Sequence, residues 1–228
     1  MYIKRKSTLI FLLCLLSIAL QNALYAGDVP NGPSRSQETD EFLTRKPVVI
    51  NYFGKVNATN AGYLANVILK EVANDNRDFH ININSGGGDP DSGLAAFNII
   101  NRLPVNITTF NANEVQSAAV YLYCLGDKKY SHPQSFFMIH SVRWNMELKT
   151  KAGILNKFTH ADLIEKRIMD IAESCMKIPS TEIRSYFTGN NDHYFNAQEA
   201  KSIGIVDEIT DKNFIPKKVY LISDDYRG

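Results

Sequence analysis

Three short segments between residues 84 and 140 carry residue types suited to acyl-transfer chemistry. The glycines at 86–88 follow a strand-like stretch, and backbone N–H groups in such a run can donate hydrogen bonds to an oxyanion. Ser117 precedes small residues, where a serine can open a helix and act as a nucleophile. His140 ends the segment 137–140 and can serve as a general base. Together the three segments predict the hydrolysis of peptide bonds.

Other kinds of functional site are not supported by the sequence. The glycine run is not followed by Gly-Lys-Ser/Thr, as in a phosphate loop, and it does not fit the dinucleotide-binding pattern. The remaining histidines lack the paired spacing of a metal motif: His80, His132, His160 and His193. No basic run suits a nucleic acid. We therefore expect no cofactor, no metal ion and no nucleic-acid partner.

Strand and helix patterns alternate along the chain. Apolar runs and alternations predict strands over residues 47–52, 79–84 and 105–110, and another strand that reaches His140. Apolar spacings of three and four predict helices over 64–72, 92–103 and 117–125, and a long helix over 150–177 that Pro179 prevents from continuing. Asn196 is expected to cap one more short helix. This alternation predicts an α/β domain with a largely parallel sheet.

The two ends of the chain are expected to lie outside this domain. Residues 1–26 are typical of a signal peptide, because basic residues precede an apolar stretch that is shorter than the roughly 20 residues needed to span a bilayer. We expect a flexible lead-in over 27–46, the folded domain over 47–215 and a C-terminal tail over 216–228. Removing the signal changes the formal net charge from +1 to 1 − 3 = −2. The protein is thus expected to be exported, either periplasmic or secreted, without a membrane anchor after cleavage.

The cysteines leave two possibilities open. Cys14 lies in the expected signal peptide, whereas Cys124 and Cys175 would reach a compartment where disulfides form. Both belong to apolar helical patterns, which favours buried thiols. Their spacing is also compatible with a disulfide.

From Val48 to Ile209 the chain resembles the proteolytic subunit of the Clp protease family. Four segments carry this resemblance in order: 83–88, the residues around Ser117, 138–140, and 197–200 leading into 204–207. The resemblance implies a ClpP/crotonase-like α/β fold of repeated β-β-α units, with a projecting handle helix at 150–177. It also implies assembly into homo-oligomeric rings and an ATP-driven unfoldase partner, from which export would separate this protein.

The resemblance also implies a role for each candidate residue. Ser117 matches the nucleophile and His140 the general base, while Gly88 and Ala118 match the positions whose backbone N–H groups form the oxyanion hole. Three positions depart from the family near these residues. Gly86 replaces the usual proline, Gln116 replaces a small residue, and Ala118-Ala119 replaces methionine-glycine.

The family's aspartate, which orients the histidine, has no direct match. Counting back from Ala197 reaches Thr188 or the neighbouring Gly189-Asn190, and Asp192 is the closest carboxylate. Asp192 is therefore the candidate third catalytic residue, and an asparagine of the same loop is the alternative. Arg143 and Trp144 are expected either to line the substrate cleft or to pack on a strand surface.

The resulting hypothesis is an exported serine endopeptidase that cleaves peptides or unfolded proteins without ATP. Two alternatives remain. The first is a catalytically inactive assembly subunit that kept the fold and lost activity with the missing aspartate. The second is a crotonase-type enzyme that acts on acyl thioesters through the same backbone oxyanion hole.

Overall fold

A computed structural model describes residues 44–143 and 150–225, which belong to one compact unit. The expected signal peptide with Cys14, most of the expected lead-in, and Trp144 lie outside the described residues. Within these ranges, no helix has the length and apolar character needed to cross a membrane.

Eight strands form one sheet. They are β1 (Val48–Phe53), β2 (Asp78–Ser85), β3 (Asn106–Gln116), β4 (Lys128–Ser131), β5 (Phe136–Ile139), β6 (His193–Asn196), β7 (Glu208–Ile209) and β8 (Lys218–Ser223). The main path through the sheet is β6-β5-β3-β2-β1-β8, with β4 and β7 attached beside β3. The pairings are parallel except for β5 with β6, which is antiparallel. The prediction of an α/β domain with a largely parallel sheet is therefore confirmed.

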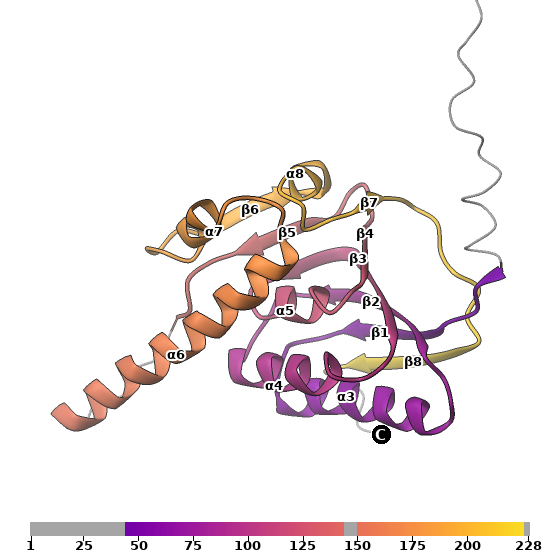
Figure 1. Cartoon of the computed structure of the whole chain (residues 1–228), viewed down its shortest axis with the longest axis horizontal. Helices are drawn as coiled ribbons and strands as arrows, with labels where there is room; N and C mark the ends of the chain where they lie inside the picture. The colour runs from indigo at the N-terminus through magenta and orange to yellow at the C-terminus, as the bar shows by residue number, and fades with distance from the viewer. Residues whose placement is uncertain (1–43, 144–149, 226–228) are drawn as a thin grey trace, which may run out of the picture. The chain divides into compact units, whose positions relative to one another are not determined.

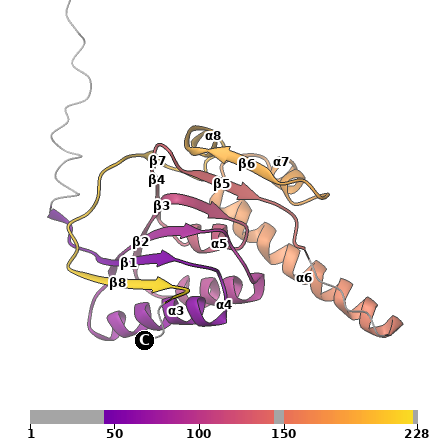
Figure 2. The ribbon, with the colours of Figure 1, turned by 180° about the vertical axis from the view of Figure 1, so that it is seen from behind.

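Six helices accompany the sheet in the described residues. They are α3 (Ala58–Ala73), α4 (Pro90–Ile100), α5 (Ala119–Tyr123), α6 (Lys151–Cys175), α7 (Ser180–Tyr186) and α8 (Ala197–Ser202). The views from front and back show α3, α4 and α5 against the same face of the sheet (Figures 1 and 2). Their apolar sides bury Leu64, Leu94 and Leu122 against Ile50, Ile81 and other strand residues of the core.

The long helix α6 is buried along only one half of its length. Its buried residues all come from the C-terminal half, beginning with Ile164, whereas Leu155 and Phe158 are 58% and 54% exposed. Thr150 caps its start by accepting a hydrogen bond from the Gly153 amide at 3.1 Å. The long helix expected over 150–177 is present as α6.

The structure differs from the expected elements at several places. The third strand was expected to end at Phe110, but β3 continues to Gln116. Four further elements were not expected, namely β4, β6, β7 and α7. The expected tail instead contains β8, which pairs with β1 from Val48↔Lys218 onward. Asp224 follows β8 and is not loose, because its carboxylate accepts hydrogen bonds from the Lys55 amide and the Asn60 side chain.

Cys124 and Cys175 form a disulfide, so the favoured expectation of buried thiols was wrong. Their Cα atoms lie 5.6 Å apart, although 51 positions separate them in the sequence. Cys124 follows α5 and Cys175 ends α6, and these two helices pack against each other. Only this packing, which spacing along the chain does not reveal, brings the two residues together.

His80 makes the stability of this fold sensitive to mild acid. Its side chain is buried in β2 beside Phe214. Burial lowers its pKa to about 4, and a hydrogen bond to Asn82, which raises the pKa, offsets only part of this effect. The unfolded chain binds the proton near pH 6.5, so protonation favours unfolding. We expect the free energy of unfolding to fall by about 3 kcal/mol as the pH drops from 6.5 to 4. Urea denaturation of the wild type and of His80→Gln over this range isolates the effect, because the variant lacks this titration; equal slopes for both would refute it.

Candidate active site

The carboxyl ends of β2, β3 and β5 bring the three predicted segments to one edge of the sheet. β3 lies between β2 and β5 and runs parallel to both. The glycine loop follows Ser85 at the end of β2, Ser117 follows β3, and His140 follows β5. Parallel strands end at the same edge, which is where ligands bind in open α/β sheets. The topology therefore gathers these segments where a site is expected.

Strand register fixes the surroundings of Ser117. Gln116 pairs with Met138, and the Ser117 amide donates a hydrogen bond to the Met138 carbonyl oxygen at 2.8 Å. Ser117 thus extends the β3–β5 ladder by one residue, alongside the stretch that leads into His140.

Ser117 occupies a strained turn between β3 and α5. Its φ of +51° lies in the left-handed region, which residues other than glycine rarely adopt. Its carbonyl oxygen accepts a hydrogen bond from the Val120 amide at 3.0 Å, so helical bonding begins at once. Strain of this kind gathers at functional sites, and a sharp strand-to-helix turn is the geometry that exposes the nucleophilic serine of α/β-hydrolases.

The glycine loop packs directly against this turn. Gly87 has a φ of +85°, and a Cβ atom there would lie 2.7 Å from the Ser117 Cβ and 3.1 Å from the Ala118 nitrogen. A larger residue at 87 would displace the serine. At Gly86, by contrast, a Cβ atom would approach only the Glu114 side chain, at 4.0 Å, so no close contact requires a glycine there.

Two backbone N–H groups are available to an oxyanion. The loop forms a bridge with Val56, in which the Val56 amide donates to the Gly87 carbonyl and the Asp89 amide donates to the Val56 carbonyl. These bonds flank Gly88 and leave its own N–H free. In the described part of the chain, neither Gly88 nor Ala118 donates its backbone N–H to an acceptor. Gly87 brings the two segments into contact, so both donors border the same turn.

His140 is half-buried, and its hydrogen bonding indicates the tautomer. Its Nδ1 lies 2.5 Å from the Ser141 carbonyl oxygen. A carbonyl oxygen only accepts, so Nδ1 carries the hydrogen and Nε2 keeps a lone pair that can take a proton. Among the described residues, no hydrogen bond joins His140 to Ser117 or to Asp192.

Asp192 directly precedes β6, the strand that pairs with β5 and so lies beside the histidine. In the antiparallel β5–β6 pair, Met138 faces Tyr194 and Ile139 faces His193, so the next position sets His140 opposite Asp192. The Asp192 carboxylate itself pairs with Arg143. The same loop is held to the segment after the histidine by the Ser141 hydroxyl, which donates to the Gly189 carbonyl at 2.5 Å. The loop that was expected to supply the third residue is therefore next to His140, while its carboxylate contacts the arginine.

A cavity of about 540 Å³ borders the glycine loop. Its lining comes from the carboxyl ends of β1, β2, β3 and β8, and includes Phe53, Gly88, Glu114 and Asp224. The expectation for Arg143 is answered only in part, since this exposed side chain binds Asp192 rather than packing on a strand.

Comparison with known proteins agrees with this architecture. The model of the Clp protease family matches residues 34–213, which is most of the chain. The protein therefore belongs to the Clp protease family, a family of peptidases.

A solved structure gives the same fold. A point mutant of ClpP1 from Listeria monocytogenes superposes with a TM-score of 0.63 at 23% sequence identity, covering 71% of this chain and 90% of that one. The predicted ClpP-like α/β fold is thus confirmed. The family match also favours peptidase chemistry over the thioester chemistry of crotonase-type enzymes.

Sequence analysis missed Ser141 entirely. Its carbonyl oxygen and its hydroxyl link His140 to the 188–192 loop. A serine after a histidine gives no signal of such a role, because its bond to Gly189 joins residues 48 positions apart in the sequence.

Proposed function

We propose that this protein is a serine endopeptidase in which Ser117 attacks the peptide carbonyl and His140 is the general base. The observation that carries this proposal is the strand order β6-β5-β3-β2. At one edge of the sheet it arranges, in sequence, Asp192, His140, Ser117 and the glycine loop. This is the order in which an orienting group, a base, a nucleophile and an oxyanion hole must stand.

Each group has a defined task in the reaction. His140 Nε2 takes the Ser117 hydroxyl proton as Oγ bonds to the carbonyl carbon, and the Gly88 and Ala118 N–H groups stabilise the oxyanion. His140 then protonates the leaving amine. In the second half of the reaction His140 takes a proton from water as the water oxygen attacks the acyl carbon, and it returns that proton to the Ser117 oxygen as the ester bond breaks. The free N–H groups and the Nδ1 hydrogen bond support these assignments.

Asp192 is proposed as the residue that orients His140 during the reaction. The register that sets it opposite the histidine supports this role. To reach the imidazole, its carboxylate has to leave Arg143, and Nδ1 has to leave the Ser141 carbonyl. These two contacts are also the observations that favour the alternative of an inactive assembly subunit.

The setting of the enzyme is part of the proposal. The disulfide between Cys124 and Cys175 supports export to an oxidising compartment, periplasmic or extracellular, where ATP and an unfoldase are absent. Cleavage of peptides or unfolded chains would then be independent of ATP.

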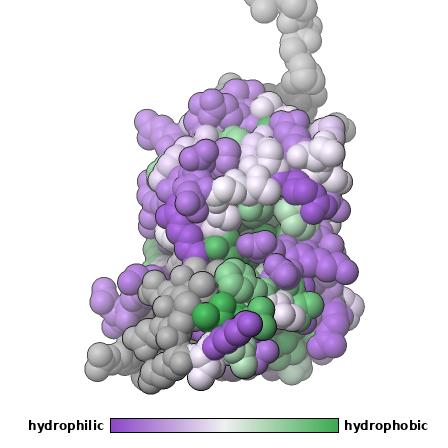
Figure 3. All heavy atoms as spheres, turned by 90° about the vertical axis from the view of Figure 1, so that its left-hand side faces the viewer, coloured by the Kyte–Doolittle hydropathy of each residue, from purple (hydrophilic) through white to green (hydrophobic). Residues whose placement is uncertain are grey.

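Figure 3 looks onto the side from which α6 extends, where apolar and polar surface lie next to each other. The exposed Leu155, Phe158 and Leu163 of α6 support assembly into a homo-oligomeric ring.

Labelling with a fluorophosphonate probe tests the proposed function, because the probe modifies only an activated serine hydroxyl. Each species separated by size-exclusion chromatography is labelled and analysed by mass spectrometry. We expect the wild type to gain one adduct on Ser117 and Ser117→Ala to gain none. His140→Ala is expected to react at least about 10³-fold more slowly than the wild type, since the base is lost.

Two further variants serve as controls. Ser202→Ala removes another serine, an exposed one on α8 whose hydroxyl donates only within its own helix, and should label at the wild-type rate. Asp192→Asn should slow labelling if the carboxylate orients His140. An unlabelled wild type in every oligomeric species would instead establish the inactive assembly subunit.

A further inference from the structure

The helix that follows Ser117 is too short to hold the serine by itself. α5 has five residues, all of them buried, and no side chain caps its start. A helix of this length has no independent stability in water. The β3–β5 ladder holds the N-terminal side of Ser117 through the Met138 carbonyl, so on its C-terminal side the strained φ of Ser117 depends on whatever holds α5 in place.

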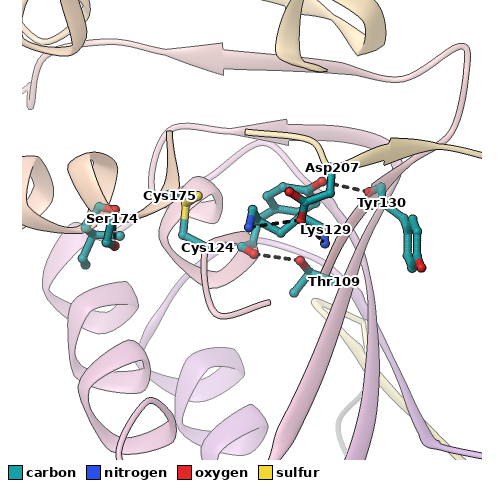
Figure 4. Close-up of a disulfide and its surroundings, with 9 residues drawn as sticks. Thr109, Cys124, Lys129, Tyr130, Ser174, Cys175 and Asp207 are labelled. Atoms are coloured by element: carbon teal, nitrogen blue, oxygen red, sulfur yellow. Dashed lines mark hydrogen bonds and ion pairs between the residues drawn. A yellow bond between two sulfur atoms is a disulfide. The ribbon is translucent and has the colours of Figure 1, made fainter. Parts of the chain in front are cut away.

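Polar contacts anchor the C-terminal end of α5 to the sheet. The Thr109 hydroxyl donates to the Tyr123 carbonyl at 2.8 Å, and the Tyr123 hydroxyl donates to the Tyr130 carbonyl at 2.9 Å. Figure 4 shows Thr109 close to Cys124, with the disulfide leading away to Cys175. These hydrogen bonds attach α5 to β3 and β4, and neither involves α6. The position of α5 relative to α6 is therefore determined by side-chain packing and by the disulfide.

The disulfide joins this short helix to the long one. Cys124 directly follows α5, and Cys175 is the last residue of α6, whose C-terminal half lies in the core. We propose that the Cys124–Cys175 disulfide is a positioning cross-link for Ser117, and that its reduction by a dithiol lowers the reactivity of the serine while the protein stays folded. This inference rests on the proposed function for its effect on reactivity.

The reduction is a balanced thiol–disulfide exchange. Cys124 is partly exposed, whereas Cys175 is only 5% exposed, so the thiolate of the dithiol attacks the Cys124 Sγ. The sulfur–sulfur bond breaks, and Cys175 leaves as a thiolate that takes up a proton. The second thiol of the reductant then displaces Cys124 as a thiol and closes its own disulfide. Two electrons pass from the dithiol to the protein.

Two measurements on the full-length protein, with and without dithiothreitol, test the cross-link. The first is the rate of fluorophosphonate labelling per folded molecule, as judged by circular dichroism. We expect reduction to slow labelling about tenfold, because a displacement of about 1 Å can cost up to 10² in rate. The second is hydrogen exchange of the amides at 119–124, which should speed up on reduction while β1 and β2 stay protected.

The pH profile separates positioning from general loosening. His140 follows β5 and is not on the cross-linked helix. Reduction should therefore lower the labelling rate by the same factor at every pH. A shift of the profile would mean that the histidine is displaced too, and would overturn an effect confined to Ser117.

Two variants complete the test. Cys124→Ala with Cys175→Ala should behave like the reduced protein and ignore dithiothreitol. Lys218→Met breaks the ion pair with the buried Glu71 (2.6 Å), far from α5 in the sequence, and should lower stability without slowing labelling.

The outcomes are decisive in each case. Equal labelling and equal exchange in the oxidised and reduced forms would overturn the cross-link, as would equal slowing by Lys218→Met. If the oxidised wild type does not label at all, the proposed function fails, and exchange at 119–124 alone decides whether the disulfide holds α5.

Discussion

Replacing Gly88 by alanine is expected to slow fluorophosphonate labelling by about 10²–10³-fold, the typical cost of losing one oxyanion donor. Gly88 has a φ of +150°, and an added Cβ atom would lie 2.2 Å from the Val56 carbonyl oxygen. Because that oxygen belongs to the backbone, the loop must move as a whole. The free Gly88 N–H then loses its direction toward the carbonyl that Ser117 attacks. The labelling rate of the folded fraction, measured as for the wild type, gives the size of the effect.

Gly62→Ala is the matched control. It adds the same methyl group to a glycine in α3, where no atom outside the adjoining helix backbone lies within 4 Å of the new Cβ. In a helix this change should be neutral or stabilising by about 0.5–1 kcal/mol and leave labelling unchanged. Wild-type reactivity in Gly88→Ala would exclude its N–H from the oxyanion hole.

Reduction of the Cys124–Cys175 disulfide is expected to lower the free energy of unfolding by about 4 kcal/mol. The bond closes a loop across 51 positions, and opening it restores the conformational entropy of that loop to the unfolded chain. Guanidinium denaturation of the oxidised and reduced protein at neutral pH measures the difference. The loss is a large part of the roughly 5–15 kcal/mol typical of a domain, so reactivity of the reduced form must be measured well below its melting temperature.

The double alanine variant controls this measurement. Its stability should be the same with and without reductant and close to that of the reduced wild type. An unchanged denaturation midpoint, with both thiols shown to be free by alkylation, would contradict the prediction.

Local patterns were sufficient to predict much of the fold. The alternation of Phe79, Ile81 and Ile83 with polar residues marks β2, and the glycine run beginning at Gly86 follows it in the structure as expected. The apolar spacing of α6 and the cap at Asn196 were likewise visible, since both depend on residues within one or two turns.

Features that depend on distant residues could not be predicted in the same way. The pairing of β5 with β6 sets Asp192 opposite His140, whereas the sequence indicated Asp192 only as the closest carboxylate to the expected position. The ion pair of Asp192 with Arg143 and the hydrogen bond of Ser141 to Gly189 join the same two distant segments. β8 was missed because its outward residues are exposed and its one neighbour, β1, is remote in the sequence.

The pairing of β1 with β8 also constrains the order in which the chain can fold. Val48 pairs with Lys218, so 218 − 48 = 170 positions separate the two partners. Such a contact carries a large loop-closure entropy and forms late in folding. Until residues 218–223 arrive, the outer edge of β1 exposes unpaired backbone groups that other chains can pair with. Newly made chains are therefore most prone to aggregate through β1, and truncation before residue 218 would make that vulnerability permanent.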